Sequence, residues 1–232
     1  MEWFQTWSAD FCDTFTRCFI KDDRYMLLLD GIGVTIRVSL VAVLIGIAIG
    51  LLIALCNLSS NKLLKVIGGI YTDVIRGTPS VTQLMIIYFV IFASVNLSKW
   101  IIAAIAFGIN SGAYVSEIIR AGILSVDKGQ TEAGRSLGLS ASQTMTRIVI
   151  PQAVKNIFPA LCNEFIVLIK ETAIVGYVGL MDIQKAGDFI KSATFEAFMP
   201  LIGTAIIYYV LIKILTLVLN RIESRLRASE VR

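Results

Sequence analysis

Long apolar runs, separated by short polar segments, are the feature that most constrains the fold of this 232-residue chain. Hydrophobic residues make up 56% of the sequence and charged residues only 16%, whereas a soluble domain carries about 25% charged residues. A helix needs about 20 apolar residues to cross a bilayer, and several runs approach that length. The chain is therefore predicted to be an all-α integral membrane protein with several crossings.

Five membrane-spanning helices are predicted. The second apolar segment, 63–95, is too long for one perpendicular crossing, and its first half is polar. Gly77-Thr78-Pro79 is expected to break or kink it, because proline has no N–H to donate. The charged stretch 173–197 is expected to be irregular. The predicted crossings are 32–56, 78–95, 100–123, 152–172 and 198–220.

Several kinds of function are excluded or disfavoured by composition. Histidine is absent, which excludes histidine-based catalysis and metal ligation. The sequence contains no P-loop pattern for binding ATP. The net charge of +4 is mild and indicates membrane orientation rather than nucleic-acid binding. We expect no catalytic residue, metal ligand or cofactor in this chain; Cys12 and Cys18 either pair outside the membrane or remain free.

The polar loop 124–147 carries signals for two short helices. Gly138 lies where a helix end commonly needs a left-handed residue, and Pro151 prevents the second helix from continuing unchanged. Two helices meeting at an angle near Gly138 are therefore predicted. The residue pairs with the spacing of helix N-cap boxes are Asp127 with Gln130 and Ser140 with Gln143.

This loop resembles a pattern found in permease subunits of ATP-binding-cassette (ABC) importers. The family pattern is Glu-Ala-Ala, three residues, Gly, nine residues and Ile-x-Leu-Pro, and the chain matches its spacing throughout. Gly134 and Ile150 depart from it, in place of Ala and Leu. The resemblance implies a loop that couples the permease to its ATPase; the alternative is a plain cytoplasmic hairpin. The implied coupling residues are Glu132, Ala133, Gly134, Leu137, Gly138, Ile148 and Pro151.

Segments 76–84, 110–123 and 159–172 resemble permeases for polar amino acids, of the histidine, glutamine and arginine type. The resemblance implies a type I ABC importer permease fold in the cell membrane, with the coupling loop in the cytoplasm. Five crossings then place the N-terminus outside and the C-terminus inside. Lys and Arg are more frequent on the loop side, as the positive-inside rule requires. The implied divisions are an extracytoplasmic segment 1–30, a permease domain 31–222 and a cytoplasmic tail 223–232.

The resemblance also implies the partners. A second permease subunit, identical or related, would complete the pathway, and an ABC ATPase dimer would supply ATP and Mg²⁺ chemistry. An extracytoplasmic amino-acid-binding protein would deliver substrate, and lipid would surround the crossings. The alternative is an ion-driven secondary transporter or channel. Such a protein is expected to show matching repeats with broken helices in both halves, and only the break at 77–79 supports it.

Ionisable groups inside the predicted crossings are candidates for function, because a charge at the bilayer centre costs roughly 2.5–3.5 kcal/mol on insertion scales. Glu164 either lines the pathway or pairs with another helix, for which Arg76 is the suggested partner. Residues three apart share a helix face, so Asp73 with Arg76, and Glu117 with Arg120, are expected to be structural ion pairs. The candidate pathway residues are Arg76, Thr78, Asn163 and Glu164.

Overall fold

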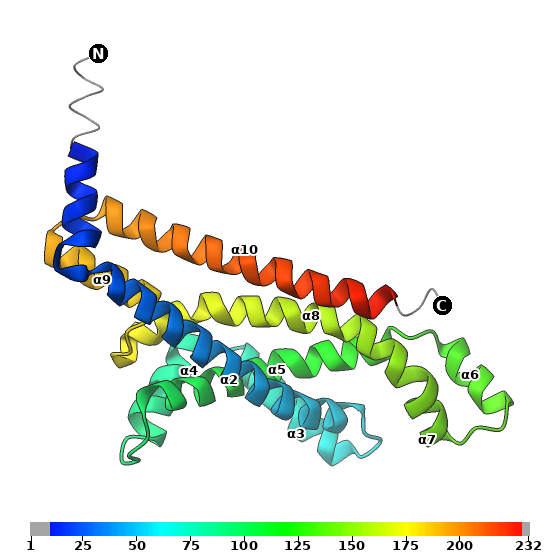
Figure 1. Ribbon diagram of the computed structural model, residues 1–232. Coiled ribbons are helices and arrows are strands. Elements are labelled where there is room, and N and C mark those ends of the chain that lie inside the picture. Colours follow the sequence, from blue (N-terminus) through cyan, green and yellow to red (C-terminus); the bar gives the residue numbers. More distant parts are fainter. Residues whose placement is uncertain (1–9, 229–232) are drawn as a thin grey trace.

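The computed structural model describes residues 10–228, which are mostly helical and contain no β-strand. Long helices run lengthwise through the molecule (Figure 1). They are α2 (Tyr25–Leu58), α5 (Lys99–Leu124), α8 (Ile150–Glu171) and α10 (Phe198–Ala228). The predicted all-helical membrane fold is thereby confirmed, although α2 begins earlier and α10 ends later than the apolar runs suggest.

The second apolar segment is broken, as predicted. Helix α3 (Lys62–Arg76) is followed by α4 (Ser80–Ile86) and a π-helical turn, η3 (Ile87–Ile91), and the two parts meet at 104°. Pro79 lies at the N-cap of α4 with extended backbone, φ −64° and ψ 135°. The break therefore lies where proline cannot continue the first helix.

The number of crossings remains a prediction. By length and composition, the described helices include three that could cross a membrane, α2, α5 and α10, or up to four if the bent pair counts as one. Helix α8, which carries Lys155, Glu164, Lys170 and Glu171, is not among these helices.

The expectation that 173–197 is irregular is wrong. A 3-10 turn, η5 (Thr172–Val178), is followed by helix α9 (Ile183–Thr194). Asp182 caps α9 by accepting hydrogen bonds from the backbone N–H groups of Gln184 and Lys185, at 3.2 and 2.9 Å. The helix was not predicted because its charged residues made the stretch look like a polar loop, whereas its other face is apolar and buried. The buried members of that face are Ile183, Ala186 and Ile190.

Helices α2 and α5 cross at very short range. An added Cβ at Gly46 would lie 2.9 Å from Ser111 Oγ, and one at Gly108 would lie 2.6 Å from the Ile45 Cβ. Gly50 and Gly112 are as close to residues on the facing helix. Gly46 and Gly50 have the Gly-x-x-x-Gly spacing that allows two membrane helices to approach closely.

The molecule has two distinct ends (Figure 1). Helix α6 (Lys128–Ser136) and helix α7 (Ala141–Thr144) form a projecting hairpin at one end. Helix α9 and the first described residues lie at the other. There, residues 10–20 are helical, ending in the π-turn η1 (Thr16–Ile20), and a 3-10 turn, η2 (Lys21–Asp23), leads into α2. Cys12 and Cys18 are free thiols, the second one buried.

Candidate functional site

The hairpin between α5 and α8 is closed by its own side chains. Ser140 and Gln143 form the predicted capping box: Ser140 Oγ accepts from the Gln143 N–H at 3.2 Å, and Gln143 Oε1 accepts from the Ser140 N–H at 2.8 Å. At the other helix, Asp127 Oδ1 accepts from the Gly129 N–H at 2.7 Å. Asp127 is a cap, as predicted, but the box with Gln130 does not form.

Gly138 lies at the corner of the hairpin in the left-handed region, with φ 84°. The Leu139 N–H donates to the Gly134 carbonyl at 3.1 Å, and Gly138 N–H donates to the Arg135 carbonyl at 3.0 Å. The Arg135 guanidinium donates to the Leu139 carbonyl at 2.7 Å. These bonds satisfy the end of α6 and confirm the predicted left-handed glycine.

The hairpin has a packed inner side and an exposed outer side. Gly134 is buried, and an added Cβ there would lie 2.8 Å from Ile148 Cδ1 and 2.9 Å from Thr144 Cγ2. Glu132 and Ala133 are exposed, and Leu137 is 82% exposed. Gly134 therefore holds the two arms together, while an apolar tip faces outward.

The second arm is not a separate short helix, which corrects the prediction. Helix α7, the π-turn η4 (Met145–Val149) and α8 follow one another without an intervening residue. Pro151 lies in the first turn of α8, directly after the π-turn. A π-turn changes the backbone hydrogen-bond register, and this accommodates a residue that has no N–H. The arm is thus continuous with α8.

A polar cluster fixes the bend between α3 and α4. The Gln83 amide nitrogen donates to the Ile75 carbonyl and the Thr78 hydroxyl, both at 2.7 Å. The Thr78 hydroxyl donates to the Val74 carbonyl at 2.8 Å, and Asn110 donates to Gln83 Oε1 at 2.8 Å. Thr78, a candidate pathway residue, therefore forms part of a structural cluster that ties the bend to α5.

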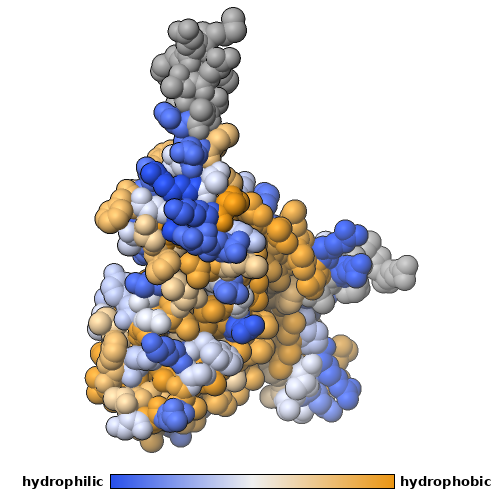
Figure 2. All heavy atoms as spheres, turned by 60° about the vertical axis from the view of Figure 1, so that its left-hand side comes forward, coloured by the Kyte–Doolittle hydropathy of each residue, from blue (hydrophilic) through white to orange (hydrophobic). Residues whose placement is uncertain are grey.

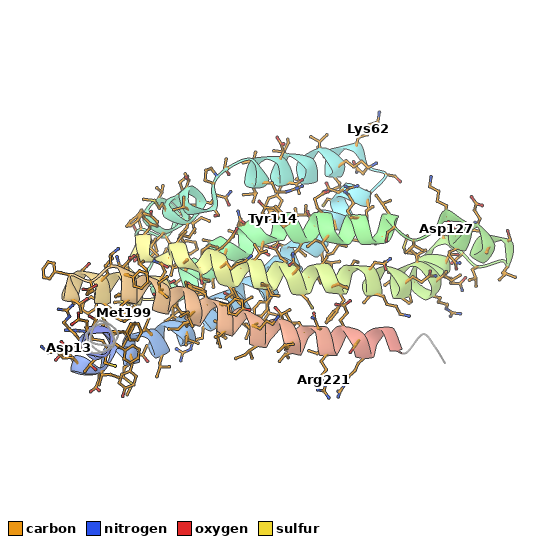
Figure 3. The ribbon with its side chains drawn as sticks, turned by 90° about the horizontal axis from the view of Figure 1, so that it is seen from above. Asp13, Lys62, Tyr114, Asp127, Met199 and Arg221 are labelled. Carbon is orange, nitrogen blue, oxygen red and sulfur yellow. The ribbon has the colours of Figure 1, made fainter. Side chains whose placement is uncertain are left out.

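A cavity of about 510 Å³ lies between α3 and α5. Figure 3 shows Tyr114 on α5 beside α3. The Arg76 guanidinium lies over the Tyr114 ring, 5.4 Å from its centroid. Glu117 forms the predicted ion pair with Arg120, at 2.7 Å. The residues that line the cavity are Gly69, Thr72, Asp73, Arg76, Gly77, Tyr114 and Glu117.

Two predicted pairings of Arg76 are wrong. Among the described residues, Arg76 forms an ion pair neither with Asp73 nor with Glu164. Asp73 and Arg76 line the same cavity instead. A three-residue spacing places two groups on one face of a helix, but here Tyr114 holds the guanidinium from the neighbouring helix.

Glu164 lies in the interior of the bundle. Its side chain accepts a hydrogen bond from Ser111 Oγ at 2.7 Å, and the residue is 9% exposed. Asn163 is exposed, so Asn163 and Glu164 do not face the same side of α8. Ser111 is also the residue that meets Gly46 at the α2–α5 crossing. The carboxyl group of Glu164 thus joins α8 to the crossing of the two other helices.

Sequence reasoning missed Gln83 and Tyr114 as site residues. Gln83 stands out as an amide within an apolar run, which is the signal that could have found it. Tyr114 gives no such signal, because a single aromatic residue in the middle of an apolar helix is usually part of the packed interior. No group of three or more Cys, Asp or Glu residues suited to a metal ion occurs within the described residues.

Comparison with known proteins gives consistent results. The family model described as "Binding-protein-dependent transport system inner membrane component" matches residues 46–228. The arginine transport system permease protein ArtQ of Bacillus subtilis is 41% identical over 205 residues, which are 88% of this chain and 94% of that protein. The glutamine transport system permease protein GlnP of Escherichia coli is 32% identical, over 87% and 93% of the two chains.

Solved structures agree in fold. A crystal structure of an amino acid ABC transporter with histidines has a TM-score of 0.82 and 43% identity, covering 89% of this chain and 98% of that one. An inward-facing structure of the MetNI methionine ABC transporter has a TM-score of 0.77 at 18% identity, covering 89% and 99%; at that identity it supports the fold alone. These likenesses favour an importer over an ion-driven transporter. The chain is a multi-pass membrane protein and belongs to the family of inner-membrane components of binding-protein-dependent ABC transport systems.

Proposed function

We propose that this chain forms the translocation pathway of an amino-acid importer and that the cavity between α3 and α5 receives the amino acid. The observation that carries the proposal is the presence of both charge signs in one cavity: Arg76 beside Asp73 and Glu117. An amino acid carries a carboxylate and an ammonium group at its α-carbon. The cavity volume of about 510 Å³ falls within the roughly 300–1,000 Å³ typical of small-molecule sites.

Arg76 is the proposed partner of the substrate carboxylate. A guanidinium can donate two parallel hydrogen bonds to a carboxylate, and the Tyr114 ring fixes where it lies. Asp73 is the proposed partner of the ammonium group, since Glu117 already binds Arg120. These groups recognise what all amino acids share. The names of the relatives, which include arginine and glutamine permeases, support this substrate class.

We propose a structural role for Glu164, in preference to a place in the substrate pathway with Asn163. Its hydrogen bond to Ser111 at 2.7 Å supports this role. Glu164→Gln keeps a side chain that Ser111 can bond, so uptake is expected to persist in reconstituted vesicles. Loss of uptake together with retained ATP hydrolysis would instead assign Glu164 to the pathway.

The α6–α7 hairpin is the proposed coupling element. Its exposed side, with Glu132, Ala133 and Leu137, would dock in a groove of a partner ATPase. The partner dimer would bind ATP and Mg²⁺. Gly138, Ile148 and Pro151 shape the hairpin rather than its docking face. A second permease subunit and an extracytoplasmic amino-acid-binding protein complete the proposed assembly in the cell membrane.

The cavity is tested by substituting Arg76 with Gln. The chain and the subunits that co-purify with it would be placed in lipid vesicles, and ATP-dependent uptake of radiolabelled arginine and glutamine would be measured. A hydrogen bond to a charged group is worth about 1.5–3 kcal/mol; the KM is therefore expected to rise roughly 10- to 100-fold. The matched control is Lys65→Gln, an exposed cation on the same helix. An unchanged KM for Arg76→Gln would contradict the proposed site.

The coupling role is tested at the tip of the hairpin. Leu137→Asp places a charge on a side chain that is 82% exposed, so it should spare the fold but weaken docking of an ATPase. The readout is the amount of ATPase that co-purifies with the tagged chain. Phe195→Asp is the matched control, because Phe195 is 95% exposed at the opposite end of the molecule. Equal recovery of the ATPase with both variants would argue against docking at this tip.

A further inference from the structure

The helical residues 10–20 are held firmly by their last turn. Cys18 is fully buried and Phe19 is 8% exposed, in a cluster with Ile183 and Ile190 of α9. The Phe19 ring lies against α10, where an added Cβ on Gly203 would be 2.8 Å from Phe19 Cζ. The earlier part of this helix projects beyond the bundle (Figure 1).

The corner that leads from this helix into α2 is also fixed. Asp22 and Asp23 both have left-handed backbone, with φ 57° and 50°, a region that Asp tolerates better than most residues. Arg24 donates to the Arg17 carbonyl at 2.6 Å and to Asp22 Oδ2 at 2.7 Å. Arg17 in turn pairs with Glu196 at 3.0 Å. The helix therefore has a set direction relative to α2 and α10.

That direction runs across the long helices, at the end opposite the α6–α7 hairpin (Figure 1). Figure 3 shows Asp13 beside the start of α10 at Met199, far from Asp127 of the hairpin. A helix that runs across membrane-spanning helices at their ends lies along the membrane surface. This placement does not depend on which side of the membrane faces the cytoplasm.

The two faces of the helix differ in polarity. Phe11 and Phe15 are 45% and 43% exposed, and the four-residue spacing puts them on the face that ends in Phe19. Since Phe19 contacts α10, which runs from there into the membrane, this face is turned toward the bilayer. Hydrophilic residues of the segment gather on the side seen in Figure 2. In the sequence, Trp3 and Trp7, outside the described residues, continue the same spacing.

We propose that residues 10–20 form an interfacial helix that lies in the plane of the membrane and is covered on its Phe11–Phe15 face by lipid. Such helices sink their apolar face about 5–10 Å into the boundary between headgroups and acyl chains. The binding is apolar rather than electrostatic, because the four aspartates of residues 10–24 outnumber the three basic residues, Arg17, Lys21 and Arg24, and the segment gains little from anionic lipid. The helix would anchor the start of α2, and with it α9, at the membrane surface.

Spin labels test the proposal in the full chain. In a variant whose natural cysteines are replaced by Ala or Ser, single labels would be placed through Phe15→Cys and, as the matched control, Asp13→Cys, with any co-purifying subunits retained in lipid nanodiscs. Collision of each label with oxygen, which concentrates in lipid, and with a water-soluble nickel chelate would then be measured. The label at 15 is expected to favour oxygen and the label at 13 to favour nickel, equally in zwitterionic and partly anionic bilayers.

Each other outcome overturns the proposal. If both labels collide with nickel equally well, the helix projects into water. If the label at 15 is immobilised and shielded from both reagents, a protein chain covers this face instead of lipid. If the oxygen preference at 15 appears only in anionic bilayers, the attraction is electrostatic. Failure of the amino-acid cavity or the coupling hairpin would leave all of these results unchanged.

Discussion

Gly138 shows how one residue can decide the shape of a functional element. Its φ of 84° is unfavourable for residues with a Cβ, while an added Cβ would find no heavy atom within 4 Å. A substitution there therefore changes backbone strain without creating a clash. For Gly134 the reverse holds. Its backbone conformation is helical and suits any residue, but the neighbouring side chains leave no room for a Cβ.

Gly138→Val is expected to loosen the hairpin, because a left-handed β-branched residue costs about 1–2 kcal/mol. Gly138→Asn is the control, since Asn tolerates this region. Recovery of the ATPase with the tagged chain, and ATP-driven uptake, should fall for Val and be largely kept for Asn. Equal behaviour of the two variants would show that the corner conformation is unimportant for coupling.

At the scale of elements, the bend between α3 and α4 depends on one amide. Gln83 joins the end of α3 to α5 through Asn110, and Gln83 is 9% exposed. Proline explains why α3 stops but not why α4 leaves in a fixed direction. That direction comes from the side-chain cluster, which joins residues far apart in the sequence.

A double-mutant cycle with Gln83→Ala and Asn110→Ala measures this link. Each single variant should lower the thermal unfolding midpoint in detergent, because each leaves polar partners unsatisfied. The coupling energy between them is expected to be about 0.6 kcal/mol, the average found for hydrogen bonds between membrane helices, and no more than about 1.7 kcal/mol, the largest value found. Additive effects would show that the hydrogen bond between the two amides contributes nothing measurable.

At the scale of the whole molecule, the hairpin and α9 lie at opposite ends (Figure 1). We therefore expect Lys128 of α6 and Ser192 of α9, both exposed, to lie on opposite sides of the membrane. With single cysteines at these positions in a cysteine-free variant, an impermeant maleimide should label position 192 in intact cells. Position 128 should react only after the cells are permeabilised. Labelling of both from outside would refute the predicted orientation.

The sequence was sufficient where structure depends on local signals. The apolar runs located the long helices, and Gly138 and Ser140 marked the hairpin within a few residues. It was insufficient where a side chain finds a distant partner. The sequence could not show that Arg76 forms no ion pair with Asp73, because this depends on Tyr114 of α5, whose ring lies against the Arg76 guanidinium. Helix α9 was not predicted because Asp182, the residue that caps it, looks in the sequence like one more charged residue of a polar stretch.

The close crossing of α2 and α5 has a consequence for how such a sequence can diverge. Gly46 faces Ser111, and Gly108 faces Ile45, with no room for another methyl group on the glycine side. A descendant that acquires alanine at 46 or 108 would have to lose volume at the facing position, or spread the helices and weaken the contact of Ser111 with Glu164. Substitutions at these facing positions are therefore expected to occur in pairs, in which a larger residue on one helix is accompanied by a smaller residue on the other.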